Sequence, residues 1–273
     1  MKRWGVKEEK AKHKELHYWY VSKNKTIGEV GEILGIAEQT VYKRMMRLGI
    51  KSDPKIKATY IAKPRGDIKI PNFYSPALAE FFGIMLGDGK LSYYQVIVTL
   101  GTKELKYSEY VVDLIQNLFG ARPKIGIRKN GYKDVYLGSI VLTSWLKNEG
   151  LVYNKVLSQV GAPKWIFNNS IFLEKFLKGL FDTDGSIYKL KFGVQISFKN
   201  KSMPLLKSIE RALKILGYRP SKVSADTIYL TRREEVLRFF KEISPANPKH
   251  QVRFAGFVKK LCVGSGAVKR DGL

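Results

Sequence analysis

One nine-residue pattern occurs twice in this chain, and this repeat constrains the fold more than any other feature. FFGIMLGDG occupies residues 81–89 and LKGLFDTDG occupies residues 177–185, so the copies are 177 − 81 = 96 residues apart. A Gly-x-Arg-Pro segment follows each copy, at residues 120–123 and 217–220. Repetition at a fixed spacing indicates two copies of one structural unit that pack together. We therefore predict an α+β fold with two pseudosymmetric halves, each with the order helix, strand pair, helix, strand pair, helix.

The strands expected after each motif have alternating apolar and polar residues. Residues 94–100 alternate around Val96 and Val98, and residues 188–199 (YKLKFGVQISFK) alternate over their whole length. A period of two is typical of an antiparallel strand with one buried face, and we interpret 188–199 as a single strand. The opposite, polar faces of the two halves carry basic and hydrogen-bonding side chains, which suit contacts to the phosphates and bases of DNA. We predict this DNA-binding role for Lys124, Arg128, Lys189, Lys191, Gln195, Ser197 and Lys199.

The charge of the chain indicates a polyanionic partner. The 273 residues include 49 Lys and Arg against 24 Asp and Glu, a net charge of +25. A compact protein with this charge repels itself unless it binds a polyanion, and nucleic acid is the leading candidate. A membrane partner would need a basic amphipathic helix or a lipidation signal, and we find neither in the sequence. With one cysteine and no secretory signal, we expect an intracellular, cytoplasmic protein that associates with the nucleoid through DNA.

A helical block is predicted before the repeats, at residues 1–55. Within it, residues 26–50 form two short amphipathic helices around a tight turn that Gly35 closes. This segment resembles a helix-turn-helix, whose second helix enters the major groove; the alternative is a small helical hairpin that packs on another part of the protein. Residues 56–75 are rich in proline and basic residues, which indicates a linker. The second helix exposes a polar set that we predict to bind DNA: Gln39, Thr40, Lys43, Arg44 and Arg47.

Small residues lie four apart in each motif, on one face of the predicted helix. Gly83 and Gly87 take these positions in the first copy, and Gly179 and Thr183 take them in the second. Small residues at this spacing let two helix backbones approach closely. We therefore expect the two motif helices to pack against each other with their C-terminal ends adjacent.

Such packing would bring together the acids that end the two motifs, Asp88 and Asp184. Two carboxylates at the negative ends of two helices are doubly unfavourable, and a divalent cation relieves both problems. Carboxylate oxygens suit Mg²⁺, which also accepts phosphate oxygens as ligands. A metal between protein carboxylates and a phosphodiester indicates phosphoryl-transfer chemistry.

Together these residues resemble the two motifs of single-chain LAGLIDADG homing endonucleases, over residues 76–260. Two copies about a hundred residues apart, each followed by an alternating basic strand, are far more specific than one copy. The resemblance implies an αββαββα fold in each repeat (76–165 and 166–273), with a saddle-shaped antiparallel sheet on the major groove. It also implies a monomer that cuts both strands of a long double-stranded DNA site with Mg²⁺, leaving short 3′ overhangs. We expect Mn²⁺ to substitute for Mg²⁺.

Matched to the family motif, Asp88 and Asp184 are the metal-binding acids, and the carbonyls of Gly87 and Thr183 are additional metal ligands. Asp182 corresponds to Leu86 in the first copy. Because this position is acidic in one copy only, we predict that Asp182 caps or pairs locally and has no catalytic role.

Family members also place basic residues around the scissile phosphates, and our catalytic candidates are Lys155 and Lys249. They follow their own motif acids at similar distances, 155 − 88 = 67 and 249 − 184 = 65 residues. Lysine is abundant in this chain, so chance placement is the alternative, and Lys164 and His250 are further candidates. Gln195 can order water, although Ile97 occupies the matching first-half position.

Two other functions fit the same fold. A DNA-binding transcriptional regulator that does not cleave would explain the helix-turn-helix, although the presence of both acids argues against it. An RNA-binding intron maturase would bind structured intron RNA on the same basic surface. Met1 cannot serve as a splicing nucleophile and the chain ends without His-Asn, so we expect intron homing or a free-standing gene rather than an intein.

Overall fold

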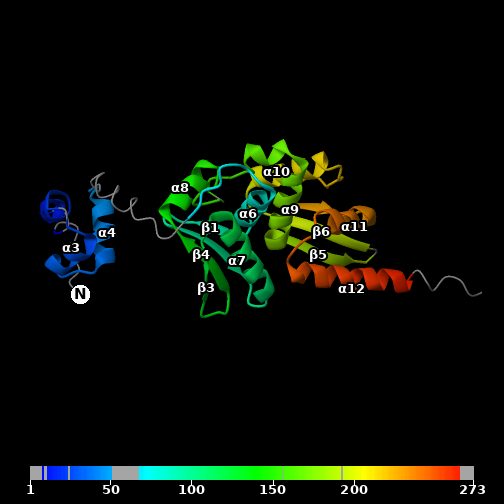
Figure 1. Cartoon of the computed structure of the whole chain (residues 1–273), viewed down its shortest axis with the longest axis horizontal. Coiled ribbons are helices and arrows are strands. Elements are labelled where there is room, and N and C mark those ends of the chain that lie inside the picture. Colours follow the sequence, from blue (N-terminus) through cyan, green and yellow to red (C-terminus); the bar gives the residue numbers. More distant parts are fainter. Residues whose placement is uncertain are drawn as a thin grey trace, which may run out of the picture. The chain divides into compact units, whose positions relative to one another are not determined.

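The structure is a computed structural model, and it describes residue 8 and residues 11–23, 25–50, 68–155, 157–191 and 193–264. The chain divides into two compact units, Met1–Pro64 and Arg65–Leu273, each described here by itself (Figure 1). Residues 56–67 of the predicted linker lie outside the described residues. Among the helices that these residues form, none is long and apolar enough to cross a membrane.

The N-terminal unit is a set of short helices around one apolar cluster. Helix α2 (His13–His17) leads into a π-helical turn, η1 (Tyr18–Ser22), which is followed by α3 (Ile27–Leu34) and α4 (Glu38–Arg47). The buried cluster draws side chains from all of these elements and from the turns between them: Leu16, Tyr20, Val30, Ile36, Val41, Met45 and Ile50.

Local sequence explains the α3–α4 hairpin. Thr26 and Glu29 form a capping box, in which each side chain accepts a hydrogen bond from the backbone NH of the other residue. Gly35 ends α3 in the left-handed conformation, with φ of 63°. A side chain at Gly31 would lie 2.7 Å from the Ile36 carbonyl oxygen, so glycine lets the two helices meet closely. The hairpin predicted at 26–50 is therefore present.

The second unit contains two copies of one order of elements, as the repeat predicts. The first half consists of α6 (Pro76–Leu86), β1 (Gly89–Leu91), β2 (Gln95–Leu100), α7 (Leu105–Phe119), β3 (Lys124–Ile127), β4 (Lys133–Gly138) and α8 (Ile140–Asn148). A 3-10 turn, η2 (Lys164–Asn168), leads to the second half. That half consists of α9 (Ser170–Asp184), β5 (Gly185–Leu190), β6 (Gly193–Lys199), α10 (Met203–Ile215), β7 (Thr227–Leu230), α11 (Arg233–Glu242) and the additional helix α12 (Pro248–Gly264).

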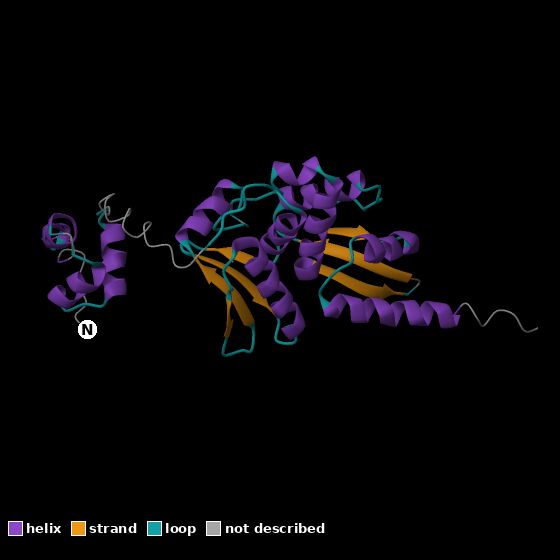
Figure 2. Ribbon diagram, in the orientation of Figure 1, coloured by secondary structure: helices purple, strands orange, loops and turns teal. Residues whose placement is uncertain are grey.

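Each half has its own antiparallel sheet, which gives the predicted α+β fold (Figure 2). The strand order is β1-β2-β4-β3 in the first sheet and β5-β6-β7 in the second. The last strand pair of the second half is reduced to β7 and an isolated bridge between Ser224 and Thr227. Ala225 and Asp226 between them both have positive φ, which closes a tight two-residue turn.

The prediction of one strand over 188–199 is wrong, because the chain reverses there. Gly193 has φ of 150° at the start of β6, and β5 and β6 pair as a hairpin. Lys189 pairs with Val194, so it lies on the sheet face that carries the core residue Val194, opposite to Gln195. The apolar alternation continues in sequence through the turn and therefore hides the reversal.

Helices α6 and α9 pack directly against each other and lie between the two sheets (Figure 1). A side chain at Gly83 would lie 2.9 Å from the Leu180 nitrogen, and one at Gly179 would lie 2.8 Å from the Ile84 nitrogen. Only glycine permits backbones this close, so the predicted contact between the motif helices is confirmed. One continuous apolar core covers both halves of the unit around this contact.

Candidate active site

The structure brings Asp88 and Asp184 together at the adjacent ends of α6 and α9. Gly87 is the C-cap residue of α6, and Asp88 follows it directly. Asp184 is the last residue of α9. A side chain at Gly87 would lie 3.5 Å from the Asp184 carboxyl carbon, so Asp184 lies beside the end of α6. Burial and the charge of Asp184 raise the pKa of Asp88 from 3.8 to about 6, and burial also raises the pKa of Asp184.

Lys155 lies at the C-terminal end of α6 and counters its negative dipole. Its ammonium donates to the carbonyls of Met85 (3.1 Å) and Leu86 (3.2 Å) and to that of Gly87. Burial lowers the pKa of Lys155, while the charges of Asp184 and Asp88 oppose this shift. The first predicted lysine thus lies beside both acids.

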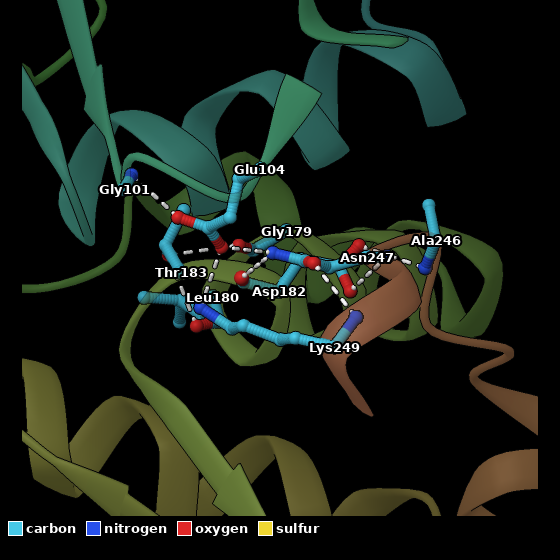
Figure 3. A network of polar contacts seen from close by, with 9 residues as sticks. All are labelled: Gly101, Glu104, Gly179, Leu180, Asp182, Thr183, Ala246, Asn247 and Lys249. Carbon is cyan, nitrogen blue, oxygen red and sulfur yellow. Dashed lines mark hydrogen bonds and ion pairs between the residues drawn. The ribbon is translucent and has the colours of Figure 1, made fainter. Parts of the chain in front are cut away.

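Lys249 also lies in the field of both acids, but a third carboxylate holds it. Its ammonium is 2.9 Å from Glu104 Oε1, and its charge lowers the pKa of Asp88 against the raising effects of burial and Asp184 (Figure 3). Glu104 precedes α7, in the loop that follows β2. Glu104 is not among the site residues predicted from the sequence.

Asp182 makes a distant contact, so the prediction of local capping or pairing is wrong. Its carboxylate accepts hydrogen bonds from the backbone NH groups of Ala246 and Asn247, each at 2.9 Å (Figure 3). Burial raises the pKa of Asp182 to about 7, although these hydrogen bonds oppose that shift. Asp182 therefore anchors the segment that carries Lys249 to the end of α9.

Asn200 contacts the second motif acid directly. Its side-chain amide donates to Asp184 Oδ2 at 2.8 Å, and its own carbonyl oxygen accepts from the Ser202 NH. The sequence did contain a signal for Glu104 and Asn200, because they are 200 − 104 = 96 residues apart, the spacing of the motifs. Both residues lie in the loop between a hairpin and the helix that follows it.

The chemistry of these donors fits a hard divalent cation. Asp88 and Asp184 are two partly buried carboxylates with raised pKa values, and a cation between them would offset the repulsion. Within the described ranges, no group of three or more His, Cys, Asp and Glu side chains is arranged to hold a metal. A pair of carboxylates matches Mg²⁺, which takes its remaining ligands from water and phosphate.

The two predicted carbonyl ligands differ in their surroundings. The Gly87 carbonyl accepts a hydrogen bond from Lys155, so a metal ion there would compete with an ammonium group. Thr183 directs its hydroxyl to the carbonyls of Gly179 (3.0 Å) and Leu180 (3.1 Å), and packs against Gly87. A role for either carbonyl in metal binding remains a prediction.

Predicted DNA-binding residues of the first sheet share its face away from the core. Lys124 pairs with Tyr136 on this face and is exposed. Arg128 forms a bidentate ion pair with Asp134, from Nε to Oδ2 at 2.7 Å and from Nη2 to Oδ1 at 2.8 Å. Its Nη2 also donates a hydrogen bond to the Thr99 hydroxyl. Half of the Arg128 side chain is exposed, so its guanidinium is oriented by protein contacts and still reaches solvent.

The predicted residues of the second sheet are divided between environments. Gln195, Ser197 and Lys199 share the face away from the core, but only 8 % of Gln195 and 7 % of Ser197 are exposed. Neighbouring side chains therefore cover both, whereas Lys199 is exposed at the strand end. Lys189 is on the opposite face, and Lys191 lies in the turn between β5 and β6.

In the N-terminal unit, one member of the predicted recognition set is misplaced. Arg44 is only 5 % exposed, so the prediction that it lies on the exposed face of α4 is wrong. It shares the buried side of α4 with Val41 and Met45, because residues three and four apart point the same way on a helix. The other members, Gln39, Thr40, Lys43 and Arg47, are exposed or half-buried.

The alternative catalytic candidates do not contact the motif acids. Lys164 is exposed at the start of η2. His250 is fully buried, with its ring 4.5 Å from that of Phe181, and burial lowers its pKa to about 3. His250 is therefore a neutral core side chain at physiological pH.

The fold and the paired acids define a two-repeat α+β protein with one acidic site at the contact of its repeats. Residues 172–244 match the family model described as LAGLIDADG-like domain. Helix α6 repeats the motif of α9 and packs on it, so the second half contains a LAGLIDADG-like domain and the first half carries a second copy of its motif helix.

One curated relative and two solved structures also resemble parts of this chain. The curated relative replicative DNA helicase DnaB of Rhodothermus marinus is 23 % identical over 239 residues, which cover 78 % of this chain and 25 % of the relative. The chain thus spans about a quarter of that protein. The structure of I-DmoI in complex with DNA and Mn is 23 % identical, with 62 % of this chain and 96 % of that chain covered and a TM-score of 0.46. Full-length DUF199/WhiA from Thermatoga maritima is 16 % identical, with 74 % and 65 % covered and a TM-score of 0.47.

Proposed function

We propose that this protein is a site-specific endonuclease that cuts both strands of double-stranded DNA with a divalent metal, Mg²⁺ or Mn²⁺. One observation carries the proposal: Asp88 and Asp184 lie together at the contact of the two motif helices, in the field of Lys155 and Lys249. Two adjacent carboxylates repel each other, and this repulsion destabilises a fold. A divalent metal ion that also binds a phosphodiester would offset the repulsion, so the pair suits a metal-dependent nuclease.

The residues of the site would have different roles in the reaction. Asp88 and Asp184 would hold the cation, which supplies activation of water and stabilisation of the leaving oxygen. Lys155 and Lys249 would offset the negative charge that develops on the scissile phosphates. Asn200 orients the Asp184 carboxylate through its 2.8 Å hydrogen bond.

The partner that we propose is double-stranded DNA. The net charge of +25 supports binding to phosphates, and Lys124, Arg128 and Lys199 reach solvent on the sheet faces away from the core. The exposed side of α4 would extend the contacts along the duplex. We further propose that the protein acts as a monomer, because one chain supplies both motif acids.

A cleavage assay tests the proposal. The full chain would be incubated with DNA libraries and candidate insertion sites, with Mg²⁺ or with a chelator, and cleavage and binding would be measured separately. We expect metal-dependent double-strand cuts that Asp88→Asn and Asp184→Asn each reduce by at least about 10³-fold. Both variants should bind the same DNA at least as tightly as the wild type, because each removes a negative charge from a DNA-facing site.

The matched control is Glu210→Gln, which removes an acid on α10 that pairs with exposed Lys214 and has no role in the proposed site. It should retain cleavage. Tight, specific DNA binding without cleavage in any divalent metal would overturn the endonuclease proposal.

That outcome would favour a second candidate function, a DNA-binding regulator that does not cleave. The α3–α4 hairpin supports this candidate, since a recognition helix suits a protein that works by occupying a site. A maturase acting on structured intron RNA is the remaining alternative, and it predicts tighter binding to intron RNA than to duplex DNA.

A further inference from the structure

Lys249 is held by a residue from the other repeat. It is the second residue of α12, at the end of the second half, whereas its ion-pair partner Glu104 belongs to the first half. The 2.9 Å contact is partly shielded from water, with 31 % of the Lys249 side chain and 14 % of the Glu104 side chain exposed. An ion pair in this setting is screened less than one on an open surface.

The Glu104 carboxylate is itself fixed by two further donors. Its Oε2 accepts from the Gly101 backbone NH at 2.6 Å, and its Oε1 accepts from the Asn247 side-chain amide at 2.6 Å (Figure 3). Burial favours the neutral acid, but hydrogen bonds from Asn247 and Lys249 outweigh it and lower the pKa of Glu104. Glu104 is therefore an ionised, oriented acceptor.

The backbone that carries Lys249 is fixed from the second repeat. Asp182 accepts the NH groups of Ala246 and Asn247, and Asn247 Nδ2 also donates to the Asp182 carbonyl at 2.9 Å. Asn247 thus joins Asp182 of α9 to Glu104 of the first half. Both ends of the lysine, its backbone and its ammonium, are held by residues other than Asp88 and Asp184.

We propose that Glu104 is a positioning residue that holds the Lys249 ammonium in place beside Asp88. The catalytic part of this inference rests on the proposed endonuclease function. Lys155 needs no such partner, because the carbonyls of α6 already hold it. A long lysine side chain without a fixed partner samples many rotamers, and loss of position near a reacting phosphate slows the reaction.

The first test is a double-mutant cycle on the cleavage rate of the full chain. Glu104→Gln keeps the shape of the side chain and an acceptor for Gly101, but removes the charge that attracts Lys249. We expect it to lower the single-turnover rate roughly 10-fold to 100-fold with unchanged DNA affinity. In a Lys249→Met background the same substitution should cause no further loss, because Glu104 acts through the lysine.

Glu235→Gln is the matched control. Glu235 is another buried glutamate, and it lies outside the site. Its carboxylate accepts a hydrogen bond from the Arg219 backbone NH and forms an ion pair with the Arg219 side chain. If the effect of Glu104→Gln is only structural, Glu235→Gln will lower cleavage and thermal stability to the same extent. Equal rates for Glu104→Gln and wild type, or losses that add in the Lys249→Met background, would overturn the proposal.

The second test does not depend on cleavage. Trace labelling with an amine-reactive reagent, read out by mass spectrometry, reports how freely the Lys249 ammonium reacts. We expect faster labelling of Lys249 in Glu104→Gln than in wild type, with Lys155 and the Glu235→Gln protein unchanged. If the wild type does not cut DNA, the endonuclease proposal fails while this measurement still decides whether Glu104 fixes Lys249. Unchanged labelling would show that it does not.

Discussion

The two motif helices, α6 and α9, contact each other through equivalent backbone positions, but they carry different side chains at other equivalent positions. Glu80 of α6 and Lys178 of α9 form a buried ion pair of 2.8 Å, and the hydroxyl of Tyr110 bonds to both. Their counterparts 96 residues away are Phe176 and Phe82, which are fully buried. The symmetry of the fold is thus one of backbone geometry, whereas buried charge distinguishes one helix from the other.

This difference bears on how the helices choose each other. A buried ion pair contributes little net stability, but a buried charge without its partner is strongly unfavourable. A contact of α6 with a second α6 would leave Glu80 without Lys178, so the pair favours the α6–α9 contact within one chain. The glycines permit the close approach, and the ion pair specifies the partners.

Removing one charge should therefore have a large effect. Lys178→Met leaves Glu80 buried without a cation, and we expect a loss of about 4 kcal/mol in the free energy of unfolding, measured by denaturant titration. Lys214→Met breaks an exposed pair with Glu210 on α10 and should cost less than about 0.5 kcal/mol. Similar losses for the two variants would show that the buried pair does not distinguish the helices.

Forcing the helices apart should have the next largest effect. A methyl group at Gly83 would collide with the backbone of α9, so we expect Gly83→Ala to lower the free energy of unfolding by about 3 kcal/mol. Gly256 of α12 has nothing within 4 Å of the added carbon, and Gly256→Ala should stabilise the helix by up to about 1 kcal/mol. Thermal unfolding of both variants measures this contrast, and a tolerated Gly83→Ala would contradict the close contact.

The pH dependence of stability compares the acidic site with an ordinary ion pair. Because the folded pKa of Asp88 is about 6 and its usual value is 3.8, the folded state binds the proton more tightly between these pH values. Ionisation of Asp88 then destabilises the fold as pH rises through this window. In chelator, Asp88→Asn should match the wild type below pH 4 and exceed its stability by about 3 kcal/mol at pH 7.

Asp134 provides the opposite sign. Hydrogen bonds from Arg128 and Thr99 lower its pKa despite partial burial, so its ionised form stabilises the fold at neutral pH. Asp134→Asn should therefore be less stable than the wild type at pH 7, and the difference should disappear as pH falls below 3.8. Equal pH profiles for the two variants would contradict the coupling of the motif acids.

The smallest expected effect concerns phosphate contacts. Lys43→Ala on α4 and Lys124→Ala on the first sheet should each reduce the slope of log affinity against log salt by about 1, with little dependence on DNA sequence. Lys214→Ala on α10 should leave the slope unchanged. A Lys43→Ala protein with the wild-type slope would mean that Lys43 does not contact a DNA phosphate.

Much of the fold follows from local patterns in the sequence. The motif spacing and the small residues four apart predict α6, α9 and their contact, because helix periodicity alone decides which residues share a face. Other features depend on long-range structure. The reversal at Gly193 is hidden by an uninterrupted apolar alternation, and the burial of Arg44 depends on which side of α4 packs inward.

The site shows the same division. The repeat predicts that Asp88 and Asp184 meet, since two equivalent helices that touch through the small residues near their C-terminal ends bring those ends together. The sequence also singles out Lys155 and Lys249 by their similar distances from these acids. Only the tertiary structure pairs Glu104 with Lys249, 249 − 104 = 145 residues away, and Asp182 with the backbone of Asn247. Those contacts depend on how loops from different repeats close over the helix ends, and no local periodicity encodes that arrangement.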